Sequence, residues 1–331
     1  MKNSIIIVTG AAGFIGSNIV AELEEAGFQK IVCVDWFSQG HKWRNIAKHN
    51  VHRFLFPEDL SGFLDQQKAH IGAVIHMGAI SSTTETDADL LIKNNIHYSV
   101  MLWDKCTQYQ LPFIYASSAA TYGAEEMVFK DQDDLAFLSQ LRPLNPYGWS
   151  KNATDIIFAQ HVLEGKKPPQ WAGLKFFNVY GPNEYHKEEM TSVITKFFYD
   201  AQTWHAVKLF KSDRKDVADG EQKRDFVYVK DCCKMVLKLL ENPHVNGIYN
   251  IGTGQARSFL DVAKAINHEM SDDIEVSFTD MPDQLKGKYQ YHTQADMRKL
   301  YEQGINFTFS SLEEGVADYL NHYLKQPDIY R

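Results

Sequence analysis

The chain has 331 residues, 44% of them hydrophobic and 23% charged, so it is long enough to bury a large core. Its formal net charge of -8 at pH 7 gives the surface no basic character, which argues against nucleic acid or an anionic membrane as a partner. No apolar run approaches the roughly 18 residues of a membrane span, and the four cysteines show no metal or redox spacing, so we expect a cytoplasmic protein with reduced thiols.

The first predicted strand, over residues 4–9, leads through a glycine-rich turn into an amphipathic helix. The first glycine of the turn permits a tight bend, the second lets backbone N–H groups approach phosphates, and the third lets the helix lie close to the sheet. This pattern predicts a pyrophosphate-binding turn for a dinucleotide cofactor. Its residues are Gly10, Gly13, Phe14, Ile15 and Gly16.

A second predicted strand, over residues 30–35, ends in Asp35. An acid about 20 residues beyond the glycine turn accepts both ribose hydroxyls of an adenosine and favours NAD, because a carboxylate repels a 2′-phosphate. Lys42 and Arg44 follow soon after, and a cation there would hold the 2′-phosphate of NADP. A solvated loop explains these two charges equally well, so both interpretations stay open. We place Asp35, Trp36 and Lys42 in the predicted cofactor site.

A third predicted strand, over residues 72–79, ends in small residues that let the backbone approach a cofactor. His76 in this strand is interpreted as a packed histidine. The helix expected over residues 87–109 carries Asn94 and Asn95, one of which either binds backbone near the ribose or bridges two elements. This region adds to the predicted cofactor site Met77, Gly78, Ala79, Ile80, Ser81 and Asn94.

The predicted catalytic residues follow a fourth strand, over residues 111–118, which ends in Ser118. Tyr147 and Lys151 open the next long helix and are four positions apart, so they share one helical face. An ammonium beside a phenol lowers the phenol pKa from about 10 towards working pH, which makes the tyrosine a usable base. The same lysine can hold the nicotinamide ribose, and Ser118 can bind the substrate oxygen whose proton moves.

Together with the glycine turn and Asp35, these residues resemble the extended short-chain dehydrogenases/reductases, in the group of nucleotide-sugar epimerases and dehydratases. The resemblance implies an α/β fold with a doubly wound parallel (Rossmann) sheet and a smaller α/β C-terminal substrate lobe. It implies a dinucleotide-binding domain over residues 1–177, with 225–252 returning to it, and a substrate lobe over 178–224 and 253–331. Dehydratases of the group carry an acidic pair just after the serine. Ala119 and Ala120 occupy those places, so dehydration is disfavoured.

A narrower resemblance rests on the segments 76–85, 178–187, 223–229 and 285–290, of which the His-Lys pair at 186–187 is the most telling. These segments resemble the ADP-glycero-manno-heptose 6-epimerases, which invert C6 of an ADP-activated heptose for the lipopolysaccharide inner core. The resemblance implies that Lys187 is a second acid/base facing Tyr147, that Lys187 and Val179 also contact the cofactor, and that the chain forms a homo-oligomer. It implies substrate contacts at Ser118, Asn178, Glu189, Lys196, Phe210, Arg224 and Tyr289, with Arg224 on the diphosphate.

The predicted cofactor is NADP, and NAD remains open because Pro57 stands where some members of the family have a lysine near the adenosine phosphate. The predicted substrate is an ADP-heptose. One alternative is a UDP-hexose 4-epimerase of the same family, which needs only the tyrosine and tolerates a neutral Lys187. The other is a non-catalytic dinucleotide sensor that binds a partner protein. The intact set of Ser118, Tyr147 and Lys151 argues against the sensor.

Overall fold

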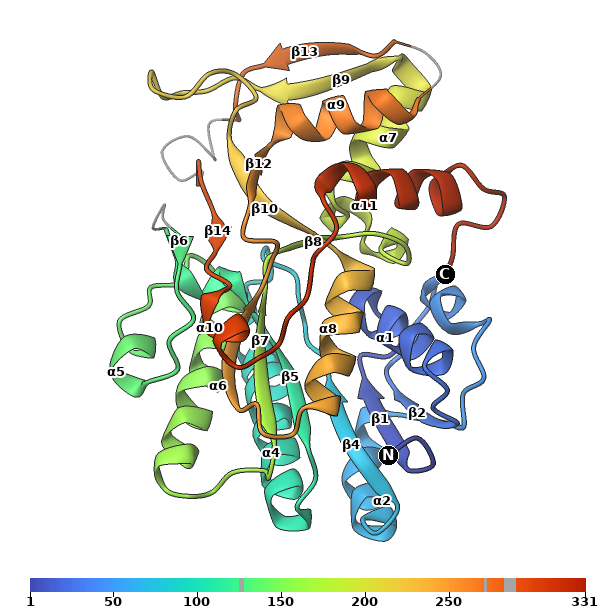
Figure 1. Cartoon of the computed structure of the whole chain (residues 1–331), viewed down its shortest axis with the longest axis vertical. Coiled ribbons are helices and arrows are strands. Elements are labelled where there is room, and N and C mark those ends of the chain that lie inside the picture. Colours follow the sequence, from blue (N-terminus) through green and yellow to red (C-terminus); the bar gives the residue numbers. More distant parts are fainter. Residues whose placement is uncertain (125–127, 271–272, 283–289) are drawn as a thin grey trace.

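The computed structural model describes residues 1–331 except 125–127, 271–272 and 283–289. Seven parallel strands form its main sheet, in the order β11-β7-β5-β4-β1-β2-β3 (Figure 1). The strand order reverses beside β1, as in the predicted doubly wound Rossmann fold. The strands are β1 (Ile5–Thr9), β2 (Lys30–Val34), β3 (Arg53–Leu55), β4 (Ile71–His76), β5 (Phe113–Ser118), β7 (Trp171–Phe176) and β11 (Gly247–Ile251).

Helices cover both faces of the main sheet. Ile6 and Val8 of β1 belong to a core cluster that includes residues of α1 (Phe14–Glu25) and α8 (Val229–Glu241). Ile5 and Ile7 point to the other face, where α2 (Leu60–Gln67), α4 (Tyr98–Tyr109) and α6 (Pro146–Leu163) supply the packing partners. Because both faces are buried, β1 is a continuous apolar run and lacks the alternating pattern of a half-exposed strand.

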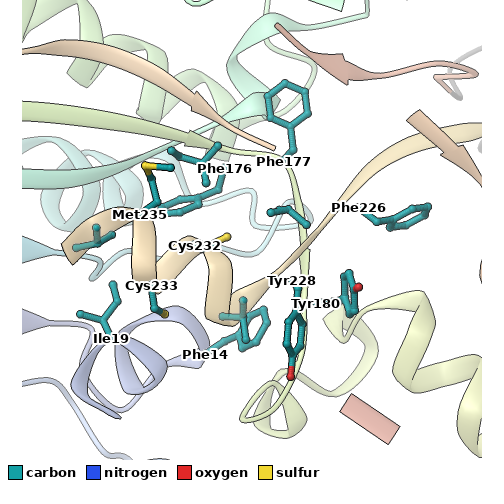
Figure 2. Packing of buried hydrophobic residues seen from close by; sticks show 14 of the residues in the cluster. Phe14, Ile19, Phe176, Phe177, Tyr180, Phe226, Tyr228, Cys232, Cys233 and Met235 are labelled. Atoms are coloured by element: carbon teal, nitrogen blue, oxygen red, sulfur yellow. The ribbon is translucent and has the colours of Figure 1, made fainter. Parts of the chain in front are cut away.

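Helices α1 and α8 pack together on one face of the main sheet. Figure 2 shows Phe14 and Ile19 of α1 in the same cluster as Cys233 and Met235 of α8, with Phe176 from the end of β7. All four cysteines of the chain are buried free thiols. This packing fixes the start of α1, and therefore the glycine turn, against the sheet.

Smaller sheets lie beyond the carboxyl ends of the main strands (Figure 1). Strand β8 (Asn178–Tyr180) begins directly after β7 and pairs with β10 (Lys223–Tyr228), which also pairs with β12 (Ala256–Ser258). The chain then returns through α8 to β11, which pairs with β7 in the main sheet. Two further pairs join β9 (Ala206–Phe210) to β13 (Glu275–Thr279), and β6 (Val128–Phe129) to β14 (Gln294–Ala295).

The helix predicted over residues 87–109 forms as α3 (Ala88–Leu91), a π-helical segment Ile92–His97, and α4. Asp87 caps it by accepting a hydrogen bond from the Leu90 N–H at 2.9 Å.

Within the described residues, none of the helices has the length and apolar character needed to span a membrane. The remaining helices are α5 (Leu135–Leu138), α7 (Val193–Trp204), α9 (Phe259–Glu269), α10 (Arg298–Glu302) and α11 (Leu312–Tyr319), with short turns at Lys42–Ile46, Pro57–Asp59, Ala119–Tyr122, Tyr185–Met190 and Leu320–Leu324.

Candidate active site

A cavity of about 730 Å³ opens at the carboxyl ends of β1, β2, β4 and β5. A doubly wound sheet binds its ligands at this place, where the strand order reverses. The cavity brings together most of the predicted site residues, which come from eight separate segments of the chain. Those that line it are Gly10, Gly13, Phe14, Ile15, Gly16, Asp35, Trp36, Lys42, Met77, Gly78, Ala79, Ile80, Ser81, Asn94, Ser118, Tyr147, Lys151, Asn178, Val179 and Lys187.

The glycine turn has the shape and the donors that a pyrophosphate requires. Gly10 has φ +63°, and a Cβ on it would lie 2.7 Å from the Gly78 backbone. A Cβ on Gly16 would overlap the Gly10 carbonyl oxygen. Among the described residues, no side chain caps α1 at Gly13, so its first N–H groups are available at the cavity wall. The turn therefore fits a dinucleotide.

Replacing Gly16 with alanine should weaken cofactor binding by at least about tenfold, because the backbone of the turn must move to admit the methyl group. Titration of the cofactor-free variant by calorimetry measures this change, and circular dichroism checks the fold. Gly62→Ala is a matched control, since a Cβ at Gly62 meets nothing within 4 Å. Equal affinities for both variants and the unmodified chain would contradict the role of the turn.

Asp35 and Lys42, which the sequence leaves as competing determinants of cofactor choice, form an ion pair. The Lys42 Nζ lies 2.6 Å from Asp35 Oδ1 and also donates to the Trp36 carbonyl at 3.0 Å. The other carboxylate oxygen accepts the Ala12 N–H at 2.9 Å, which ties the end of β2 to the glycine turn. A carboxylate and an ammonium thus stand together at the expected place of the adenosine ribose.

The two asparagines of the π-helical segment have different positions. Asn95 is buried and binds both the N–H and the carbonyl of Ile80, at 2.8 and 3.0 Å, and the Ser150 hydroxyl at 3.0 Å. It is therefore the asparagine that bridges elements. Asn94 lines the cavity and donates to the Leu90 carbonyl at 2.9 Å, so its cofactor contact stays a prediction.

His76 is the packed histidine that the sequence predicts. Its two ring nitrogens lie 2.6 Å from the Thr9 hydroxyl and 2.9 Å from the Ser99 hydroxyl. Burial lowers the pKa of His76 to about 3, with a smaller effect from Lys151, so the ring is neutral at physiological pH. His76 supports the floor of the cavity without carrying a charge.

Ser118, Tyr147 and Lys151 all line the cavity. Asn145 caps α6 by accepting the Gly148 N–H at 2.8 Å, which sets the first helical turn and the Tyr147 side chain on it. The prediction that Lys151 lowers the pKa of the Tyr147 phenol is wrong for this structure: burial raises that pKa, and a hydrogen bond with Ser118 only partly lowers it again. The Lys151 Nζ donates to the Ala116 carbonyl at 2.8 Å, and burial lowers its pKa to about 8. This set can hold and transfer a proton.

Lys187 reaches the same cavity from the turn that follows β8. Burial lowers the pKa of Lys187, and the nearby Glu184 carboxylate raises it in part. Glu184 is fully buried and accepts hydrogen bonds from the Ser192 N–H at 2.5 Å and the Thr195 hydroxyl at 2.7 Å. These bonds fix the turn between β8 and α7, so Lys187 is held as a second titratable group at the cavity.

Four predicted substrate contacts do not line the cavity: Glu189, Lys196, Phe210 and Arg224. Glu189 and Lys196 are exposed, and the lysine Nζ donates to the Glu189 carbonyl at 2.5 Å. The Arg224 guanidinium lies 5.8 Å from the centre of the Phe259 ring, and Phe259 is at the cavity wall. Their substrate contacts stay predictions, and Tyr289 lies outside the described residues.

Sequence reasoning did not include several residues of the cavity wall. His186, the neighbour of Lys187, is one of them, and burial together with the nearby Lys42 and Lys187 lowers its pKa to about 4. The hydroxyl residues Thr191 and Ser192 follow the same turn, and this polar pair was a usable sign. Phe226 and Phe259 come from distant elements, and no local pattern distinguishes them from core aromatics.

Comparisons with known proteins agree with this geometry. The model of the NAD dependent epimerase/dehydratase family matches residues 6–252. The chain is 46% identical to an ADP-L-glycero-D-manno-heptose-6-epimerase of Nitratidesulfovibrio vulgaris (strain DP4), over 97% of this chain and 98% of that one. It is 45% identical to a protein of the same name from Fusobacterium nucleatum, over 98% and 100%.

A solved structure from Helicobacter pylori, also named ADP-L-glycero-D-manno-heptose-6-epimerase, superposes with a TM-score of 0.80 at 29% identity, over 97% of this chain and 96% of that chain. The similarity thus includes the smaller sheets as well as the main sheet. The family match itself spans the glycine turn, the serine, tyrosine and lysine of the inner cavity, and Lys187. The chain belongs to the NAD dependent epimerase/dehydratase family.

Proposed function

We propose that this chain is an ADP-L-glycero-D-manno-heptose 6-epimerase that supplies a precursor of the lipopolysaccharide inner core. The observation that carries the proposal is the presence of two proton-transfer groups, Tyr147 and Lys187, in one cavity with a dinucleotide-binding turn. Relatives with this name are 45% and 46% identical over nearly the whole chain, which supports the same substrate.

Inversion at C6 explains why two such groups are useful. The C6 hydroxyl must lose its proton as the carbon becomes a ketone, and the oxygen must regain a proton after the sugar has presented its other face. Tyr147 serves one of these steps and Lys187 the other, so neither side chain has to follow the moving oxygen. Ser118 orders the reacting oxygen, and Lys151 holds the ribose. A bound nicotinamide dinucleotide would supply the hydride acceptor and donor.

The direct test is to incubate the purified protein with an ADP-heptose of one C6 configuration and to separate the products by chromatography. We expect an equilibrium mixture of the two C6 epimers without added reductant or oxidant, because the hydride returns to the carbon it left. Equilibration of UDP-glucose with UDP-galactose, and an unchanged ADP-heptose, would support the 4-epimerase. No turnover of either sugar by cofactor-loaded protein would support the sensor.

We propose that the cofactor is NADP and that Lys42 supplies the cation for its 2′-phosphate. The Asp35–Lys42 pair supports this, because the ammonium offsets a carboxylate that would otherwise repel the phosphate. Gly10, Gly13 and Gly16 would lie along the pyrophosphate, and Lys151 at the nicotinamide ribose.

Replacing Lys42 with methionine should lower the affinity for NADP relative to NAD by about tenfold or more, because Asp35 then faces the phosphate without a counter-ion. Calorimetric titration of the cofactor-free variant with each dinucleotide gives the ratio. Lys30→Met is a control, since Lys30 is exposed at the far end of β2. An unchanged NADP/NAD ratio would mean that Lys42 is only a loop lysine.

We also propose that residues 178–224 and 253–331 form the substrate lobe, and that the protein is a cytoplasmic homo-oligomer. Asn178, Val179, Lys187 and Phe259 belong to these residues and line the cavity, which supports the first part. Light scattering on the purified protein tests the second part, and a monomer at all concentrations would exclude it.

A further inference from the structure

A fully buried ion pair lies beneath the catalytic residues. The Lys175 Nζ is 2.8 Å from Asp155 Oδ2, and neither side chain has any exposed surface. Asp155 is on α6, four positions after Lys151, so it continues the helical face that carries Tyr147. Lys175 is on β7, where it pairs in register with Ser117, the neighbour of Ser118.

Among the described residues, the other side-chain hydrogen bonds of the pair go to the segment that ends in, or follows, Ser118. Asp155 accepts from the Tyr115 hydroxyl at 2.9 Å and from the Ser117 hydroxyl at 2.7 Å. The Lys175 ammonium donates to the Thr121 hydroxyl at 2.6 Å. The pair therefore ties the strand end of Ser118 to the helix of Tyr147 and Lys151.

Stability alone does not account for such a pair. The desolvation of two charges offsets most of their attraction, and well-packed apolar residues of the same volume often give an equally stable protein. A charge that is buried so close to a catalytic site, however, acts through a low dielectric and changes the proton affinity of its neighbours.

The neighbours are the catalytic groups. The Asp155 carboxylate raises the pKa of the Tyr147 phenol and also that of Lys151, against the lowering effect of burial on the lysine. An uncompensated Asp155 would therefore oppose formation of the Tyr147 phenolate. The ammonium of Lys175 lies 2.8 Å from the Asp155 carboxylate, and an opposite charge at this distance offsets the field of the carboxylate.

Further groups from the described residues also face this site. Ser118 from β5 hydrogen-bonds Tyr147, and His76 from β4 is near Lys151 but neutral. Lys187 lines the cavity from the turn after β8. The Lys175 ammonium lies 5.1 Å from the centre of the Tyr122 ring, in a cation–π contact. Tyr122 remains a neutral phenol, because burial raises its pKa well above the usual value.

We propose that Lys175 is a positioning residue for the epimerase reaction: it neutralises Asp155, and the pair joins Ser118 to the helix of Tyr147 and Lys151. The inference rests on the proposed function for its effect on turnover. It does not require that the sugar be an ADP-heptose, because it concerns the proton affinity of Tyr147 and the position of Ser118.

The test compares K175M, D155N and the double variant D155N/K175M in the cofactor-loaded protein. K175M leaves the carboxylate uncompensated, so the Tyr147 pKa should rise by about one pH unit or more. D155N removes the carboxylate, so the Tyr147 pKa should fall. The double variant removes both charges and should return close to the unmodified protein, with kcat recovered and KM little changed throughout.

Two readouts separate failure of this inference from failure of the proposed function. The pH dependence of kcat reports on turnover. Titration of tyrosine labelled with ¹³C at Cζ, with the Tyr147 signal assigned by Tyr147→Phe, reports the same pKa without any substrate. Opposite shifts in K175M and D155N support the proposal even if no sugar is turned over.

The same Tyr147 pKa in all folded variants, with only a lower melting temperature, would overturn the proposal and leave the pair with a structural role. If K175M does not fold, D155N and the double variant still decide the question. A Tyr147 pKa that stays the same in D155N would then be the contradicting result, because loss of the carboxylate must lower it.

Discussion

Tyr147→Phe should abolish most of the epimerase activity while the protein keeps its bound cofactor. The phenylalanine ring fills the same space in the cavity, so the loss is confined to the hydroxyl that exchanges a proton with the sugar. A positioned acid or base contributes about 10²- to 10⁴-fold to a rate, and we expect kcat to fall within this range. Chromatography of the C6 epimers gives the rate, and absorbance of the released dinucleotide gives the cofactor content.

The pH dependence adds a second criterion to this experiment. Burial raises the pKa of Tyr147 above its usual value, so its base form is scarce at neutral pH and increases as the pH rises. The kcat of the unmodified protein should therefore rise as the pH is raised above neutral. The residual rate of Tyr147→Phe should lack that rise. Tyr301→Phe is a control, because Tyr301 is 39% exposed and away from the cavity. A variant that keeps more than about a tenth of the rate would exclude Tyr147 as the base.

Lys187→Met should have the second largest effect, a loss of about 10²-fold or more in both directions of the reaction. Methionine preserves much of the length and apolar surface of the side chain, although it lacks the Nζ that lies 5.1 Å from the centre of the Phe14 ring. Only the titratable amine is removed. A complete inversion needs proton transfer in both poses of the sugar, so loss of one group stops the cycle even though Tyr147 is intact.

Lys264→Met provides the control for this change, because Lys264 is exposed on α9. Burial lowers the pKa of Lys187, so its neutral form is available at a lower pH than for an ordinary lysine. A Lys187→Met protein that epimerises ADP-heptose at the normal rate would make Lys187 a loop lysine. The 4-epimerase would be favoured by two results together: the unmodified protein does not convert ADP-heptose, and Lys187→Met converts a UDP-hexose as fast as the unmodified protein does.

Local patterns were sufficient for the elements that carry the site. The apolar run before Gly10, the glycine spacing and the four-residue separation of Tyr147 and Lys151 depend only on residues close in sequence. Helix starts follow the same rule: Ser258 and Ser311 each form a capping box, with Asp261 and Glu314. The sequence by itself therefore determined the strand–turn–helix units, the cofactor turn and the tyrosine–lysine pair.

Only the tertiary structure decided how these units meet. The pairing of Asp155 with Lys175, the choice of Asn95 over Asn94 as the bridging residue, and the presence of Lys187 in the cavity all depend on contacts between separate elements. The same is true of Glu189, in the turn after β8, and of Lys196, on α7, which are both exposed. Spacing along a chain fixes which side chains share a helix or strand face. Which faces share a site depends on the order of the strands and on the packing of distant segments. This packing also buries some charges and exposes others.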